Sequence, residues 1–214
     1  LRTLNKLTFL TLDNVDMSED CCRSMCNSIS DCDHLYSLEL KDIKLHDGVL
    51  ELRTLNKLTF LTLDNVDMSE DCCRSLCNSI SECDHLDSLE LENITLWDGV
   101  LDLRSLNNLT HLTLWKVTMS MECSRALCSS LSGCTDLQLQ ELNLMTLHNG
   151  VFALKNLALP SHVQSGVTMS GESSRGLCWN IDGCTHLDNL QLRNIHYFVL
   201  ELKGLINLTS LTLD

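Results

Sequence analysis

The sequence has few aromatic residues, a single proline, few basic residues and no long hydrophobic segment. Aromatic residues fill only 4% of its 214 positions, which is unusual for a compact enzyme of this size. Lysine and arginine together number 15 against 29 aspartates and glutamates, so the formal net charge is −14. This charge argues against nucleic acid and anionic membranes as partners, because both attract clustered basic residues. No apolar run approaches the roughly 20 residues that span a bilayer, so we expect no membrane insertion.

The sequence is built from repeats of 51 residues, each containing two unequal halves. The first two copies match at all but eight of 51 positions. The pattern LxxLxL begins each half, as at Leu7 and Leu35, and its starts are alternately 28 and 23 residues apart. This spacing is that of leucine-rich repeats and predicts one array of about nine repeats. Its double units span residues 1–51, 52–102, 103–153 and 154–201, with a partial unit at 202–214.

The leucine pattern predicts short parallel strands. Side chains alternate between the two faces of a strand, so Leu10 and Leu12 point into a core while Thr11 and Asp13 point outward. One strand cannot bury its leucines alone, whereas stacked copies form a continuous core. We therefore predict an α/β fold, a leucine-rich repeat solenoid shaped as a curved horseshoe with its parallel β-sheet on the concave face. The chain starts within a repeat and stops at a bare strand, so we expect a fragment of a longer protein.

The segments that connect the strands are of two kinds. In the longer half, Ser18 is a good helix N-cap, and an apolar stripe with helical spacing follows it. The stripe consists of Cys22, Met25, Cys26 and Ile29. The shorter half has leucines every three residues from Leu52 to Leu58, which suits a 3₁₀ or extended return. Helical and 3₁₀ or extended segments are therefore expected to alternate on the convex side.

Three features depart from a regular repeat. In DLQLQELNL the frame fits either Leu137 or Leu139, so the register of this strand can slip by one or two residues. In LALPSHVQSGVTM, Pro160 removes a backbone donor, and we expect a distorted strand within 157–169. The ninth position of the repeat, usually asparagine, is apolar from Val15 to Val117.

Cysteines and a histidine are concentrated in SEDCCRSMCNSISDCDH, residues 18–34, and again at 69–85. Such ligands suit zinc, but later copies replace Cys22 with Ser124 and His34 with Asp136, so we expect no metal and no cofactor. Equivalent cysteines of successive units lie two strands apart, roughly 10 Å, which is too far for a disulfide. Pairing between different cysteine rows stays open. We expect reduced thiols that fill the core and a cytoplasmic protein.

No nucleophile with a base, phosphate-binding loop or calcium loop stands out, so we expect no enzyme and no catalytic residues. What remains is the outward side of the strands, which is acidic with exposed aromatic residues. The alternative is an idle face with binding elsewhere. Five of the eight differences between the first two units lie between positions 36 and 46, beside this face. The candidate surface consists of Phe9, Thr11, Asp13, Glu39, Lys41, Phe60, Thr62, Asp64, Glu90, Glu92, His111, Thr113, Trp115, Glu141, Gln191 and Arg193.

The combined pattern LxxLxLxxVxM-SxExxRxLCxxIxxC-xxL resembles the ribonuclease-inhibitor and NOD-like receptor class of leucine-rich repeats, over essentially the whole chain. The resemblance implies a sensor and autoinhibitory domain in innate immunity. Its partners would be a protein or microbial ligand and adjoining domains of the full-length chain. Two alternatives remain open, the substrate-recognition repeats of an F-box ubiquitin ligase and an extracellular leucine-rich receptor ectodomain.

Overall fold

A computed structural model describes residues 6–45 and 48–131, and beyond them seven short strands between residues 138 and 213. The first part contains β1 (Phe9–Asp13), α1 (Glu19–Ser30), β2 (Ser37–Leu45), the 3₁₀ helix η1 (Leu52–Thr54), β3 (Phe60–Met68), α2 (Glu70–Ser81), β4 (Ser88–Glu92), β5 (Thr95–Leu96), β6 (His111–Trp115), β7 (Thr118–Met119) and α3 (Met121–Leu131). The later strands are β8 (Gln138–Asn143), β9 (Thr146–Leu147), β10 (Phe152–Ala153), β11 (Leu177–Asn180), β12 (Asn189–Leu192), β13 (Phe198–Glu201) and β14 (Ser210–Leu213).

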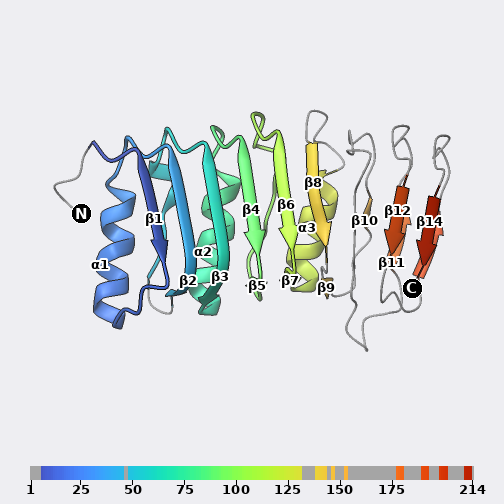
Figure 1. The fold of residues 1–214 in the computed structure, drawn as a ribbon, viewed down its shortest axis with the longest axis horizontal. Coiled ribbons are helices and arrows are strands. Elements are labelled where there is room, and N and C mark those ends of the chain that lie inside the picture. The colour runs from blue at the N-terminus through green and yellow to red at the C-terminus, as the bar shows by residue number, and fades with distance from the viewer. Residues whose placement is uncertain are drawn as a thin grey trace.

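The main sheet has six parallel strands in the order β1-β2-β3-β4-β6-β8. Figure 1 shows these strands side by side, with α1, α2 and α3 behind them. A second parallel sheet, β5-β7-β9, follows the ends of the main strands. The predicted stack of parallel strands is thus confirmed, and the chain forms a solenoid.

The strand leucines form the core, as the alternation predicts. Leu38, Leu40, Leu63, Leu91 and Leu114 are fully buried. Adjacent strands are in register, so each leucine packs beside its equivalent in the next strand. Burying a leucine contributes about 1.5–3 kcal/mol, and the stacked rows sum this effect along the array.

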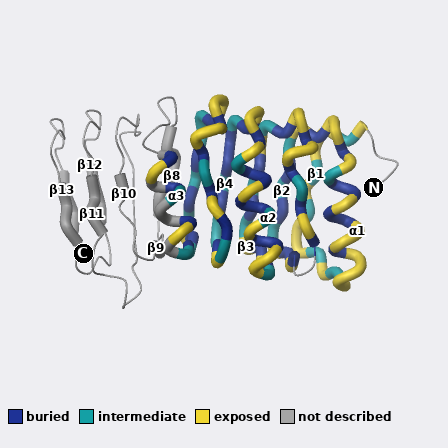
Figure 2. Tube along the Cα trace, turned by 180° about the vertical axis from the view of Figure 1, so that it is seen from behind, coloured by how far each residue is buried: buried dark blue, intermediate teal, exposed yellow. Residues whose placement is uncertain are grey.

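The helices form where the cap and the apolar stripe predict them. The Ser18 hydroxyl accepts a hydrogen bond from the Cys21 amide, 3.4 Å away, and Ser69 does the same for Cys72 at the start of α2. Cys22, Met25, Cys26 and Ile29 are all buried against the strands, which confirms the predicted stripe. In Figure 2, exposed and buried residues alternate along α1 and α2.

The other return segments differ among themselves. The 3₁₀ helix η1 follows β2, whereas residues 97–110, between β5 and β6, contain only turns and irregular backbone. The repeat predicts a helix in the longer half of a unit, but residues 177–180 in the fourth unit form the strand β11, paired with β10 and β13. Gly171 and Gly176 lower the helix propensity of this segment, and Trp179 favours a strand. The segment 157–169 with Pro160 lies outside the described residues, and the curvature of the array stays a prediction.

A slip in register is found at β8, where the sequence frame is ambiguous. Leu112 of β6 pairs with Leu139, and Thr113 then pairs with Glu141, so Gln140 is an extra residue. Such a bulge inserts one residue in one strand and restores the alternation beyond it. Leu142 therefore pairs with Leu114, in line with the leucines of the earlier strands.

Glycine makes the close approach between the helices and the short return segments possible. A Cβ atom on Gly48 would lie 2.4 Å from Sγ of Cys26 and 2.9 Å from Sγ of Cys22. At Gly99, where φ is +103°, it would lie 2.9 Å from Cβ of Cys77. The helix cysteines are therefore small residues packed against a glycine. This contact explains why the position of Cys26 and Cys77 holds no leucine.

A left-handed residue follows the central part of β1, β2, β3, β4 and β6, one position before the apolar ninth position. These residues have φ between +48° and +52° and are Asn14, Asp42, Asn65, Asn93 and Lys116. Asparagine and aspartate tolerate this conformation better than other non-glycine residues. The side-chain amide of Asn65 donates to Asp42, and that of Asn93 donates to Asp64 Oδ1 at 2.8 Å. This row was not predicted from the sequence, because the usual asparagine of the repeat stands at the ninth position and this row lies at the eighth.

Candidate binding surface

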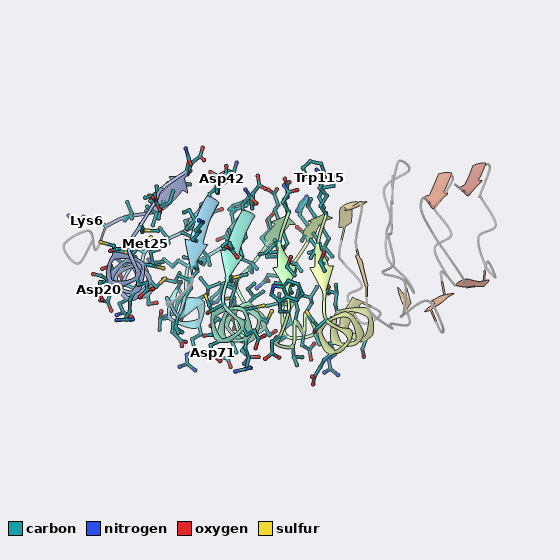
Figure 3. All side chains as sticks on the ribbon, turned by 90° about the horizontal axis from the view of Figure 1, so that it is seen from below. Lys6, Asp20, Met25, Asp42, Asp71 and Trp115 are labelled. Carbon is teal, nitrogen blue, oxygen red and sulfur yellow. The ribbon has the colours of Figure 1, made fainter. Side chains whose placement is uncertain are left out.

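The face of the main sheet opposite α1–α3, here called the open face, displays three rows of outward side chains. Figure 3 shows Trp115 on this side of the sheet and Asp71 on the helix side. Pairing of the strands aligns the rows. The first row is Phe9, Ser37, Phe60, Ser88 and His111. The second is Thr11, Glu39, Thr62, Glu90 and Thr113, and the third is Asp13, Lys41, Asp64, Glu92 and Trp115.

The second row alternates threonine and glutamate because each 51-residue unit contributes two different strands. The Thr11 hydroxyl donates to Glu39 Oε2 at 3.0 Å, and the Thr62 hydroxyl donates to Glu90 Oε2 at 3.2 Å. The same contact thus recurs every second strand, roughly 9.6 Å along the sheet. Hydrogen bonds to a carboxylate fix its orientation, so these glutamates are held in a regular row.

Charge changes along the open face. Lys41 Nζ lies 2.6 Å from Glu39 Oε1, and this hydrogen bond lowers the pKa of Glu39 and raises the pKa of Lys41. The second unit has Glu92 where the first has Lys41, so the lysine that offsets Glu39 has no counterpart beside Glu90. The face therefore becomes more acidic from β2 to β4.

Exposed aromatic residues begin β1 and β3, and a tryptophan ends β6. Phe9 is 64% exposed and Phe60 37% exposed, as expected for outward positions. Trp115 is half-buried, and the ammonium of Lys116 lies 4.3 Å from the centre of its ring, a cation–π contact. These residues give the acidic face exposed apolar groups, the composition that binding surfaces use as anchors.

Not every predicted surface residue is described. Glu141 belongs to β8 and pairs with Thr113, so its backbone continues the second row. Gln191 belongs to β12, which pairs with β14. Arg193 lies outside the described residues. Whether this set of residues binds a partner stays a prediction.

Tyr36 is a surface residue outside the set predicted from the sequence. It precedes β2, is 40% exposed, and its ring packs against Phe9 and Phe60 with centroid distances of 5.8 and 5.3 Å. A signal was available, because Tyr36 is one of the positions where the first two units differ and Asp87 replaces it in the second.

The cysteine-rich segments hold no metal site in the part of the chain that the structure describes. There, no group of three or more histidine, cysteine, aspartate or glutamate side chains could hold a metal ion. The cysteines described are free thiols, and all of them except Cys21 are buried. Burial raises the pKa of Cys26, Cys72 and Cys83 to about 12, which keeps them protonated.

The described thiols predict the outcome of a thiol count. We expect all 13 cysteines to react with a thiol reagent after denaturation. In the native protein, Cys21 reacts first because it is exposed, while buried thiols such as Cys26 and Cys83 react at least tenfold more slowly. Peptide mapping of a timed alkylation measures this order. Fewer than about eleven reactive thiols after denaturation would contradict the reduced core.

None of the helices within residues 6–45 and 48–131 is long and apolar enough to cross a membrane. The strand repeat, the parallel sheet and the helices on one side together define a leucine-rich repeat solenoid.

Solved structures support this class. The fold resembles that of internalin C2 from Listeria monocytogenes, with a TM-score of 0.58 and 20% identity, over 99% of this chain and 82% of that one. A second internalin of the same organism aligns with a TM-score of 0.31 and 16% identity, over 99% of this chain and 83% of that one. This TM-score is too low to indicate a shared fold. No protein-family model and no curated protein matches the sequence. At this level of identity the likeness concerns the fold alone.

Proposed function

We propose that this chain is a non-catalytic protein-binding module that uses the open face of its main sheet. One observation carries the proposal: the outward side chains form aligned rows with exposed aromatic residues and ordered carboxylates. A rigid sheet holds these rows in place, so binding requires little ordering of the surface. A partner that matches them carries basic side chains over the second and third rows.

A charge-matched pair of variants tests this proposal. The first, Glu90→Gln with Glu92→Gln, removes two negative charges from β4 on the open face. The second, Glu70→Gln with Asp71→Asn, removes two from the first turn of α2, behind the sheet. Affinity capture from cells that express the protein, followed by calorimetry on each recovered partner, compares the two.

We expect the open-face variant to weaken binding at least fivefold. This difference in affinity becomes smaller as the salt concentration is raised, because salt screens charges near an interface. The variant in α2 retains the affinity of the original protein. Equal affinities for the two variants, or a loss limited to the α2 variant, would contradict the proposal.

We further propose that the module serves as the sensor repeat domain of a cytoplasmic NOD-like receptor. The repeat pattern and the cysteines that fill the helix rows support this role. The coding sequence upstream of Leu1 provides the test. A nucleotide-binding oligomerisation module there agrees with the proposal, whereas an F-box or a secretory signal contradicts it.

A further inference from the structure

A pocket of about 510 Å³, here called the corner pocket, lies where the chain enters β1, β2 and β3. Its size falls within the range of natural ligand sites, roughly 300–1,000 Å³. The lining residues are Lys6, Thr8, Phe9, His34, Tyr36 and Lys57. Apart from Phe9, none of them belongs to the predicted open-face set, so the pocket is a separate feature beside the first row.

The apolar side of the pocket is ordered by backbone hydrogen bonds. The Tyr36 amide donates to the Thr8 carbonyl at 2.7 Å, and the Thr59 amide donates to the Tyr36 carbonyl at 2.9 Å. These bonds fix the backbone of Tyr36, and Phe9 and Phe60 pack against its ring from either side. The aromatic wall exists before any ligand binds, which lowers the entropic cost of binding.

The polar side of the pocket is basic, in contrast to the rest of this acidic chain. Lys6 and Lys57 line it, and Lys57 Nζ lies 3.3 Å from Nδ1 of His34. Asp33 adds a negative charge beside this pair, with its Oδ1 at 3.7 Å from the same ring nitrogen. Two ammonium groups next to an aromatic wall select a ligand that is both anionic and apolar.

We propose that the corner pocket binds an acidic segment of a partner protein, in which a carboxylate lies next to an aromatic or aliphatic side chain. The inference rests on the proposed function and specifies which segment of that partner occupies the pocket. Tyr36 packs on Phe60 of the first row, so the pocket and the open face form one continuous surface. A polypeptide that fills the pocket can continue across the sheet, which a small molecule of this volume cannot do.

The charges of the two regions also fix the direction of the bound segment. The corner pocket is basic, whereas the third row at the other end of the strands is acidic, since Asp13, Asp64 and Glu92 outnumber its single lysine, Lys41. The partner must therefore place its acidic part at the start of the strands and its basic part towards their ends. A segment with the reverse order meets like charges at both ends, which disfavours it.

The second unit provides a natural control for the pocket. At positions 51 residues later, Lys6, Thr8, Phe9 and His34 have their counterparts in Lys57, Thr59, Phe60 and His85. Tyr36 and Lys57 do not, because Asp87 and Asn108 stand in their places. In the second unit a carboxylate, Asp87, thus replaces the Tyr36 ring, and an amide, Asn108, replaces the Lys57 ammonium, while the other four lining positions are the same.

Binding of a capped tetrapeptide, acetyl-Gly-Glu-Phe-Gly-amide, to the full chain tests the proposal. Titration followed by amide NMR shifts is expected to show saturable changes at residues 34–37 and 57–60. The same peptide with glutamine in place of glutamate binds at least fivefold more weakly, because only its charge differs. Equal binding of the two peptides, or shifts confined to other residues, would overturn the proposal.

Exchanging residues between the two units separates binding from folding. Tyr36→Asp with Lys57→Asn abolishes the shifts at 34–37, while Asp87→Tyr with Asn108→Lys adds a second site at residues 85–88. Circular dichroism verifies that both variants fold, and the gain of a site cannot arise from misfolding. Failure to gain a site, or binding that persists after the first exchange, contradicts the proposal.

Phenylacetate serves as the probe for a free aromatic acid. If it binds as tightly as the acidic peptide, the occupant is a small molecule and the proposal of a protein segment is wrong. The charge variants of β4 lie outside the corner pocket, so the two proposals fail independently. If the β4 variant binds partners as tightly as the original protein while the acidic peptide still binds, only the open-face function is overturned. If the β4 variant weakens partner binding but the acidic peptide does not bind, only the pocket proposal is overturned.

Discussion

Replacing Gly99 with alanine is expected to lower the free energy of unfolding by about 3 kcal/mol. Two effects add at this position. Its φ of +103° is one that side-chain-bearing residues rarely adopt, and the new Cβ would lie 3.0 Å from Cα of Arg74 and 2.9 Å from Cβ of Cys77. Both neighbours belong to the body of α2, so only a shift of the helix or of the return segment relieves the contact. Denaturant unfolding of the full chain measures the loss.

Gly48 in the first unit is the matched control. A Cβ there meets mainly the thiol sulfurs of Cys26 and Cys22, which are side-chain atoms. Gly48→Ala is expected to cost about 1–3 kcal/mol, and Cys26→Ala in the same chain should restore part of it by removing the sulfur. Cys77→Ala cannot restore Gly99→Ala, because the Cβ of residue 77 and the backbone of Arg74 remain. A full rescue of Gly99→Ala by that change would contradict the assigned contact.

Asn65→Val is expected to cost about 2–3 kcal/mol. Asn65 has φ of +51° at the bend within β3, and its amide donates a hydrogen bond to Asp42. Valine cannot make this bond, and its branched Cβ is strongly disfavoured in the left-handed region. The loss appears as a lower midpoint of denaturant unfolding, with an unchanged dependence on denaturant concentration.

Two substitutions separate the backbone effect from the lost hydrogen bond. Asn65→Gly keeps the backbone conformation accessible and is expected to cost about 1 kcal/mol or less, mainly for the bond. Lys116, with φ of +51°, is the member of the row without an asparagine or aspartate side chain. Lys116→Asn is expected to stabilise the chain by about 0.5–1 kcal/mol. If Asn65→Gly lowers the free energy of unfolding as much as Asn65→Val does, the left-handed backbone conformation is not the cause of the loss.

Local periodicity explains why so much of the first two and a half units was predictable. The leucine spacing determines strand faces, and the Ser18 cap with its apolar stripe determines α1, because both patterns depend on residues close in sequence. The same reasoning failed at 177–180, where a helix was expected and β11 forms. There the glycines weaken the local preference, and pairing with β10 and β13 decides the structure.

The candidate surface was only partly predictable for a different reason. Alternation correctly placed outward residues such as Glu39 and Trp115, since one strand suffices to assign a face. Tyr36 precedes its strand, and only the packing of three neighbouring strands brings it between Phe9 and Phe60. The corner pocket depends on loops that come together across 51 residues, which no single repeat reveals.

The sequence by itself determined the repeat length, the inward leucines and the helical position of the cysteine-rich segment, because each follows from spacing within one unit. The tertiary structure alone decided which glycine each helix cysteine faces, where left-handed residues bend the strands and how the rows of the open face align. Those features depend on the register between strands and on the close approach of Gly48 and Gly99 to the helices. Contacts between strands, helices and return segments that lie far apart along the chain set both, and local spacing does not contain that information.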